Sequence, residues 1–182
     1  MAQGEVTELL ARWQQGDPEA QDKLTRLIYP EIKAMARRRA RGSDSIGAST
    51  LVSETFVKLL SSGGTQPGDR RQFFALMATI MRQVIIDEAR AVGRLKRAGR
   101  NVTLHDEAVA DDSFERAQFL IDVDRILDRL EASDERLCRV FECRFFAGLT
   151  IDETSQALGI PPRTVERLWS HARELVRADL AG

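Results

Sequence analysis

The stretch "TIDETSQALGIPPRTVERLWSHARELVR", residues 150–177, contains two helical patterns separated by a break. Thr150 precedes the first pattern. Gly159 ends it, because a helix C-terminus often needs a residue in the left-handed conformation. Pro161 and Pro162 then prevent a smooth continuation of the helix. This order predicts a helix-turn-helix, in which the second helix presents its outer side chains to a partner.

The outer face of that second helix is polar. We expect it to expose Arg163, Thr164, Glu166, Arg167, Ser170 and His171. Arginine can donate two hydrogen bonds to a guanine edge, and hydroxyl or guanidinium groups can hold phosphates. This composition favours DNA binding. A helical hairpin with a solvated outer face is the simpler alternative, and the motif alone leaves it open.

The composition is that of a soluble globular chain. The 182 residues carry a net charge of -1, with 43% hydrophobic and 30% charged residues, so the chain can bury a core. Few glycines and prolines separate long stretches with helical apolar periodicity. We therefore predict an all-α fold.

Several function classes find no support in the sequence. No apolar run approaches the ~20 residues of a membrane span, and the N-terminus lacks a secretion signal, so we expect a cytoplasmic protein with no membrane contact. Cys138 and Cys143 do not have a metal-ligand spacing, and no histidine is near them. No hydrolytic triad or phosphate loop is present. We expect no catalytic residue, no metal site and no cofactor.

The chain divides into two small helical domains. Residues 1–95 read as four helices, with Asp17 as N-cap of the second and a fourth, strongly apolar helix that should be central. Residues 96–116 lose periodicity and turn acidic, so we expect a linker there. Residues 117–182 read as a second domain that ends in the helix-turn-helix, with Ser133 as one of its N-caps.

The sequence of residues 150–177 resembles the C-terminal DNA-reading domain of extracytoplasmic-function sigma factors of the sigma-70 family. The N-terminal half agrees with this resemblance. "LVSETFVKLL", residues 51–60, resembles the helix that docks on the β′ clamp of RNA polymerase. "FFALMATIMRQVIIDEAR", residues 73–90, resembles the promoter-melting helix of the family. The resemblance covers nearly the whole chain in the right order.

The resemblance implies a non-enzymatic transcription initiation factor. Domain 1–95 would be a sigma-2-like bundle that opens the -10 element, and domain 117–182 a sigma-4-like domain that reads the -35 element with the polar face described above. The family motif R-N-x-x-x-D-x-x-R is matched with glutamine in place of asparagine. The implied -10 residues are Arg71, Arg82, Gln83, Asp87, Arg90, Arg94 and Arg97. The loop 61–71 would hold a base flipped from the non-template strand.

The implied partners are promoter DNA and core RNA polymerase, contacted at the β′ clamp helices and the β flap. On the clamp helix the implied contact residues are Leu51, Val52, Glu54, Thr55 and Lys58. The acidic linker would thread near the RNA exit path. An anti-sigma factor holds many relatives, and the sequence leaves such a partner open.

The segment before the clamp helix departs from the family. Many members carry Asp-Ala-Glu-Asp there, whereas this chain has residues 47–50, "GAST". Thr50 or Ser49 would simply cap the helix in one interpretation. In the other, a Ser/Thr protein kinase phosphorylates Thr50, or less readily Ser49, and restores the missing negative charge. We hypothesise a phosphoprotein that is nearly inactive until modified.

Three other classes of protein remain as alternatives. A stand-alone helix-turn-helix regulator would account for the C-terminal part but leaves the clamp-like helix without a role. An enzyme or cofactor-binding helical protein has no motif in its support. A structural adaptor would not explain the basic runs of the sequence.

Overall fold

The computed structural model describes residues 2–40, 47–61, 67–97 and 104–182. Within these segments the elements are α1 (Ala2–Gln14), α2 (Pro18–Ala40), α3 (Ala48–Ser61), α4 (Arg70–Arg97), α5 (Leu104–Glu131), α6 (Glu135–Phe141), a π-helical turn η1 (Glu142–Phe146), α7 (Ile151–Leu158) and α8 (Pro162–Ala181). The predicted all-α fold class is confirmed. None of the helices in these segments is long and apolar enough to cross a membrane.

Helices α1 and α2 form a hairpin whose turn is fixed by Asp17. Asp17 Oδ1 accepts hydrogen bonds from the backbone N–H groups of Glu19 at 2.9 Å and Ala20 at 3.2 Å. Its Oδ2 accepts a hydrogen bond from Arg12 Nη2 at 2.7 Å. These bonds satisfy N–H groups that the first turn of a helix leaves without partners, so the predicted N-cap is confirmed.

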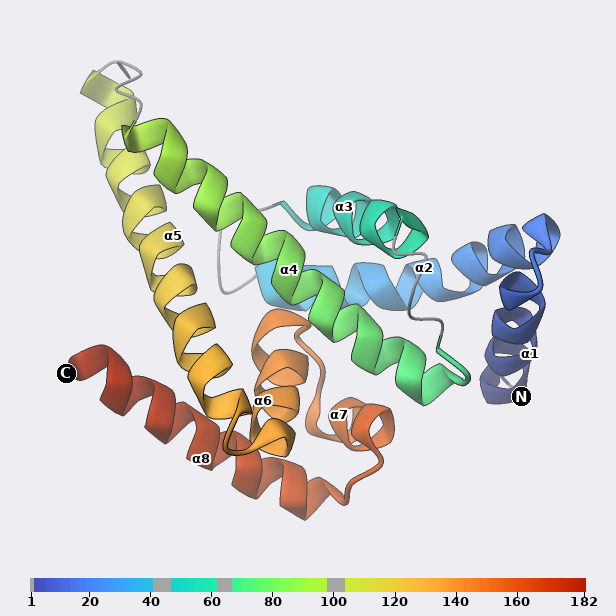
Figure 1. Cartoon of the computed structure of the whole chain (residues 1–182). Coiled ribbons are helices and arrows are strands. Elements are labelled where there is room, and N and C mark those ends of the chain that lie inside the picture. The colour runs from blue at the N-terminus through green and yellow to red at the C-terminus, as the bar shows by residue number, and fades with distance from the viewer. Residues whose placement is uncertain (1, 41–46, 62–66, 98–103) are drawn as a thin grey trace.

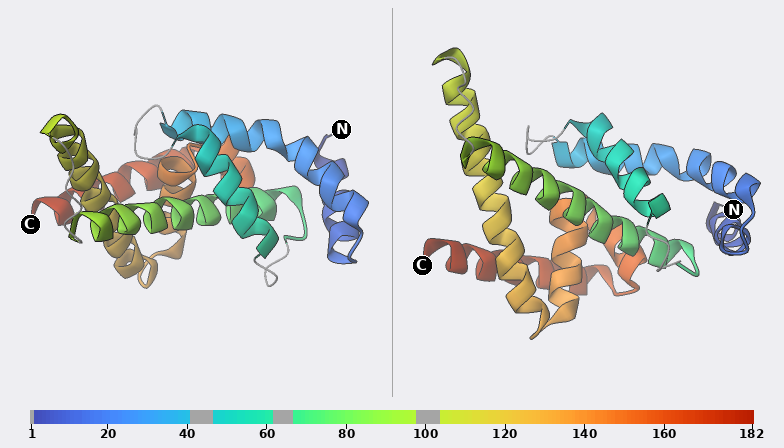
Figure 2. Two further views of the ribbon diagram at one scale, coloured as in Figure 1. Left: turned by 90° about the horizontal axis from the view of Figure 1, so that it is seen from above. Right: turned by 45° about the horizontal axis from the view of Figure 1, so that its top comes forward.

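Helix α4 lies at the centre of the molecule, and α5 runs back alongside it (Figures 1 and 2). The apolar positions of α4 recur every three to four residues and form a broad face. Its buried side chains include Phe73, Met77, Met81 and Ile85. Helix α4 contacts α1, α3, α5, η1 and α7, so it joins the N-terminal and C-terminal parts of the chain.

The buried apolar side chains belong to one continuous core. It includes Leu10 of α1, Ile28 of α2, Phe73 of α4, Leu127 of α5 and Phe146 of η1, and none of these is more than 1 % exposed. The core thus crosses the segment that we expected to separate two domains. The division into domains stays a prediction, but the two parts pack against each other in this conformation.

A widened helical turn, η1, joins α6 to the helix-turn-helix. The backbone N–H of Ala147 donates to the carbonyl of Glu142, five residues earlier, at 3.1 Å. Phe145 packs edge-on against Phe146, with 4.9 Å between the ring centroids, and lies 5.0 Å from Phe141. The π-turn was not expected from the sequence, and it brings both adjacent phenylalanines against the C-terminal core.

The secondary structure differs from expectation at two places in the second half. Helix α5 begins at Leu104, so residues 104–116 of the expected linker are helical, whereas 98–103 lie outside the described residues. Acidic residues near a helix N-terminus interact favourably with its dipole, which accounts for a helix in an acidic segment. The N-cap of α6 is Asp134, not Ser133. The carboxylate of Asp134 accepts the N–H of Leu137 at 2.9 Å.

Candidate nucleic-acid interface

The turn between α7 and α8 is built as a helix-turn-helix. The hydroxyl of Thr150 accepts the N–H of Glu153 at 3.2 Å, and the Glu153 carboxylate accepts the N–H of Thr150 at 2.7 Å. This reciprocal capping box starts α7. Gly159 ends the helix at φ +66°, a left-handed value. The Ser155 hydroxyl then donates to the Ile160 carbonyl at 2.6 Å and holds the turn.

Helix α8 presents the predicted polar face to solvent. Its inner face buries Val165, Ala172 and Val176. The residues predicted to contact the -35 element are exposed, except Thr164, which is half-buried; the exposed ones are Arg163, Glu166, Arg167, Ser170 and His171. The pattern is that of a helix anchored on one side and free to enter a groove on the other.

The residues predicted to contact the -10 element lie on α4, but not all are accessible. Four positions from Gln83 to Arg94 follow helical spacing and are exposed: Gln83, Asp87, Arg90 and Arg94. Arg71 is exposed near the start of the helix. The side chain of Arg97 and residues 62–66 of the predicted base-holding loop lie outside the described residues.

Arg82 is buried, with 8% of its surface exposed, and is surrounded by acids. Its Nε donates to Asp124 Oδ1 at 2.8 Å, and its Nη1 donates to Glu142 Oε1 at 2.9 Å. Its Nη2 donates to Asp128 Oδ1 at 2.6 Å. Burial alone would lower the pKa of Arg82, but the hydrogen bonds with Glu142 and Asp124 outweigh it and raise that pKa above its ordinary value.

Further hydrogen bonds extend this network beyond Arg82. Glu142 is also buried, and its Oε2 accepts hydrogen bonds from the Thr79 hydroxyl and from Arg139 Nη1, both at 3.1 Å. Arg90 Nη2 donates to Asp124 Oδ2 at 3.1 Å. The groups line a groove of about 450 Å³ between α4 and the helices α5 and α6. In this groove Arg82 and Arg90 of α4 pair with carboxylates of the second half of the chain: Asp124, Asp128 and Glu142.

The burial of side chains on the clamp-like helix α3 contradicts part of the predicted polymerase contact. Leu51, Val52 and Thr55 are buried in the core of the chain itself, at 2%, 3% and 1% exposure. The Thr55 hydroxyl donates to the Leu51 carbonyl at 2.6 Å. These three side chains therefore do not form an accessible surface. Glu54 is exposed, and Lys58 is half-buried and forms an ion pair with Asp87 of α4.

The accessible face of α3 is partly apolar. Val57 is 60% exposed and Leu60 is 46% exposed. Tyr29 of α2 is also exposed and stacks on Phe56, with 6.0 Å between the ring centroids. Exposed apolar side chains gathered beside charged ones are typical of a protein contact.

Residues 47–50, where many relatives carry acids and this chain does not, form the start of α3. The carbonyl of Gly47 accepts the N–H of Leu51 at 3.0 Å, so Gly47 occupies the N-cap position. The capping interpretation for Ser49 and Thr50 is therefore wrong, because both lie inside the first turn, after the cap. Both side chains are exposed, and the first turn contains no acidic residue.

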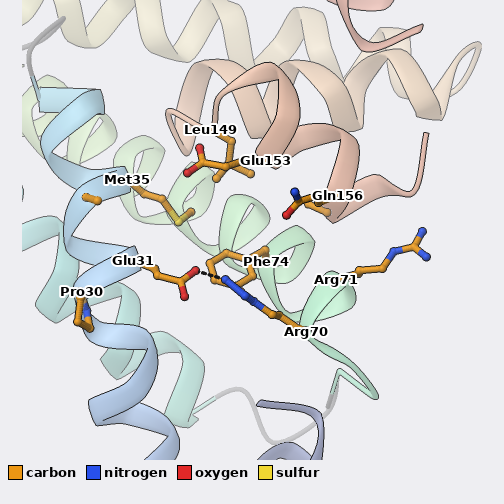
Figure 3. A pocket seen from close by; sticks show the side chains of 11 residues that line it. Pro30, Glu31, Met35, Arg70, Arg71, Phe74, Leu149, Glu153 and Gln156 are labelled. Atoms are coloured by element: carbon orange, nitrogen blue, oxygen red, sulfur yellow. Dashed lines mark hydrogen bonds and ion pairs between the residues drawn. The ribbon is translucent and has the colours of Figure 1, made fainter. Parts of the chain in front are cut away.

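A pocket of about 240 Å³ lies where α2, α4 and α7 meet. Figure 3 shows Arg70 pointing toward Glu31, with which it forms an ion pair, while Arg71 extends the other way. Phe74 and Met35 give the pocket an apolar wall. The pocket is thus formed jointly by the N-terminal helices and the helix-turn-helix.

Sequence reasoning missed the partners of Arg82. Glu142 lies 60 residues from it in the chain, and no local pattern links the two positions. The one signal available was the spacing of Asp124 and Asp128, which places two acids on the same face of a helix.

Comparison with known proteins agrees with this geometry. A family model described as "ECF sigma factor" matches residues 3–182. No curated protein and no solved structure matches the chain. The family match spans both the clamp-like helix and the helix-turn-helix, which a stand-alone DNA-binding domain would not require. The chain belongs to the extracytoplasmic-function sigma factors, which direct RNA polymerase to promoter DNA as alternative initiation factors.

Proposed function

We propose that this sigma factor reads the -35 element with α8 and that phosphorylation of Thr50 switches on its binding to core polymerase. One observation supports the promoter contact: on α8 the side chains of Arg163 and Arg167 are exposed, while the opposite, apolar face of the helix is buried. Arginine contacts to guanine specify sequence, and contacts to phosphate add affinity that falls with salt. The exposed residues of α4, from Gln83 to Arg94, would hold the -10 strand.

The polymerase contact we propose uses the accessible face of α3. Glu54 and Lys58 supply charge, and Val57 and Leu60 supply apolar area. The buried core of a protein interface is typically apolar with a polar rim, and this face has that composition. The clamp surface of β′ that the family uses is basic. The absence of acids at the start of α3 therefore weakens the electrostatic attraction between the two proteins.

The switch rests on the position of Thr50. It is exposed, and it lies in the first turn of α3 among N–H groups that have no helical acceptor. A phosphate adds about -1.5 to -2 charges, which the positive end of a helix dipole stabilises. Phosphorylation would therefore place negative charge where the relatives carry carboxylates. A Ser/Thr protein kinase would be the activating partner, and the protein would work in the cytoplasm.

The test compares binding of core polymerase to the chain with and without phosphothreonine at position 50. We expect tight binding only for the modified protein, no activation for Thr50→Ala, and partial activation for Thr50→Asp, which carries less charge than phosphate. Ser53→Ala is the matched control, because Ser53 is also an exposed hydroxyl residue of α3 but lies one turn further along.

The outcomes separate the parts of the proposal. Equal, tight binding of both forms would keep the polymerase contact and remove the switch. Binding of neither form would refute the proposed polymerase contact through α3. Dependence on a third protein that blocks the unmodified chain would point to an anti-sigma factor instead of a kinase.

A further inference from the structure

The last turn of α2 contains an arginine that packs on an aromatic ring. Arg39 is half-buried, and its Nε is buried without a hydrogen-bond partner. Its guanidinium lies over the ring of Phe145 of η1, with 5.0 Å between the guanidinium carbon and the ring centroid. Helix α2 closely approaches the segment after η1 at Gly148, whose ideal Cβ would lie 3.2 Å from the backbone nitrogen of Arg39. Packing therefore fixes the position of Arg39.

A second arginine lies close to this one. Phe119 of α5 contacts Phe145, with 6.4 Å between the ring centroids. Arg116 is half-buried and precedes Phe119 by three residues, so both lie on the same side of α5. Burial lowers the pKa of the Arg39 guanidinium, and the nearby charge of Arg116 lowers it further. The two guanidinium groups are thus close enough to repel each other.

Neither guanidinium pairs with a carboxylate among the described residues, although Asp112 lies one turn before Arg116 on α5. Other arginines nearby are paired. Arg38 pairs with Glu153 at 2.9 Å, and three carboxylates surround the buried Arg82. A buried charge normally has a partner, because removing a charge from water is costly. Two adjacent cations without an acid therefore indicate a site for an anion that is not part of this chain.

The side chains around the two arginines specify the chemistry of that anion. Two planar guanidinium groups can donate several hydrogen bonds to the oxygens of one phosphate group. The ring of Phe119 is 43% exposed beside them. An exposed aromatic ring is a surface on which a nucleobase can stack. A nucleotide uses both features, because it joins a phosphate to a base, whereas an inorganic anion uses only the arginines.

We propose that Arg39 and Arg116 bind the phosphate of a nucleotide whose base stacks on Phe119. The nucleotide is either a free nucleoside phosphate or part of a single strand, since both present the same two groups. The site consists of residues from α2, α5 and η1. It is separate from the promoter and polymerase surfaces proposed above, which lie on α3, α4 and α8, so it can be tested independently of them.

Isothermal titration calorimetry of the full chain measures binding of two probes. They are the nucleoside triphosphates of the common bases and a single-stranded oligonucleotide of about four nucleotides. Arg39→Gln and Arg116→Gln each remove one guanidinium, and we expect each to weaken binding about tenfold or more. The matched control is Arg37→Gln, which removes the same charge from an exposed position of α2, about 200° around the helix from Arg39. We expect this control to bind like wild type.

The source of the phosphate follows from the two probes. Weaker triphosphate binding in the arginine variants assigns the site to a free nucleotide, and weaker binding of the oligonucleotide alone assigns it to a strand. Phe119→Ala tests the contribution of the base. We expect it to weaken nucleotide binding and to leave binding of inorganic triphosphate unchanged, because only the nucleotide has a base that can stack.

A charge reversal tests the arginine pair without any ligand. Arg116→Glu supplies Arg39 with a carboxylate, so we expect the midpoint of thermal unfolding to rise by about 2–4 °C. The same variant should lose nucleotide binding, because the carboxylate occupies the guanidinium of Arg39 and repels phosphate. Arg37→Glu makes the same change of charge at an exposed position and should not raise the midpoint.

Two results would overturn the proposal: no nucleotide binding by the wild-type chain, or equal binding by the Arg39→Gln, Arg116→Gln and Arg37→Gln variants. Equal loss of nucleotide and inorganic triphosphate binding in Phe119→Ala would refute the stacking of a base. Circular dichroism checks the fold of each variant. Should Arg39→Gln not fold, Arg39→Lys replaces it, because lysine keeps the charge but lacks the planar fork and should still weaken binding.

Discussion

Gly148 offers a sharp test of the packing between the two parts of the chain. It has φ +63°, and an added Cβ would lie 3.1 Å from the carbonyl oxygen of Met35 and 3.2 Å from the backbone nitrogen of Arg39. Both atoms belong to the backbone of α2 and cannot rotate away. The left-handed conformation costs a non-glycine residue about 1–2 kcal/mol, and overpacking adds about 1–3 kcal/mol. These costs sum to about 2–5 kcal/mol, and the less flexible unfolded chain offsets about 0.4–1 kcal/mol of that, so we expect Gly148→Ala to lower the free energy of unfolding by about 3 kcal/mol.

The matched control is Gly16→Ala. Gly16 has φ +84°, but nothing lies within 4 Å of its ideal Cβ, so this change brings the conformational strain without the contact. We expect it to cost about 1 kcal/mol after the gain from a less flexible unfolded chain. Urea denaturation measures both variants against wild type. Equal losses for Gly148→Ala and Gly16→Ala would refute the close packing of α2 against the segment before α7.

Four further outcomes are expected. Thr150→Ala removes half of the capping box and should cost about 1 kcal/mol of stability, measured by urea denaturation. Arg82→Ala removes one partner from the buried carboxylates of Asp124 and Glu142, which keep Arg90 and Arg139, and should cost about 3 kcal/mol by the same assay. Burial raises the pKa values of Cys138 and Cys143 to about 11 and 12, so above pH 9 the unfolded chain loses those protons before the folded chain does. Stability should therefore fall as the pH rises from 9 to 11, and a urea midpoint unchanged over that range would contradict this expectation. Arg167→Ala should weaken DNA binding and reduce its salt dependence, measured by titration at several salt concentrations.

The parts of the fold that sequence could predict are those with local signals. Gly159 with the two prolines after it specifies the turn between α7 and α8, and Asp17 specifies the start of α2. These features depend on backbone conformations that few residues adopt, so the residue types alone are informative.

The parts that sequence could not predict depend on distant neighbours. Helix α3 has apolar residues on more than one side, and only the packing of α2 and α4 decides that Leu51 is buried while Val57 is exposed. Arg82 belongs to a residue type that is rarely buried, and its acids come from two other helices. In η1 a backbone N–H bonds to the carbonyl five residues earlier, and this depends on how the phenylalanines of η1 fill the core. The periodicity of apolar residues does not predict it.

The π-turn has a consequence for how the chain tolerates insertions and deletions. A π-turn contains one residue more than the α-helical turn it replaces. Removing a single residue from 142–146 would let an ordinary helix form there, at little cost in local hydrogen bonds. A π-turn and an α-turn both complete one revolution of the backbone, so the elements that follow would keep nearly the same direction. The same deletion within the ordinary helix α6 would turn everything after it by about 100°, so the π-turn is the place where the chain can lose one residue and leave α8 facing the same way.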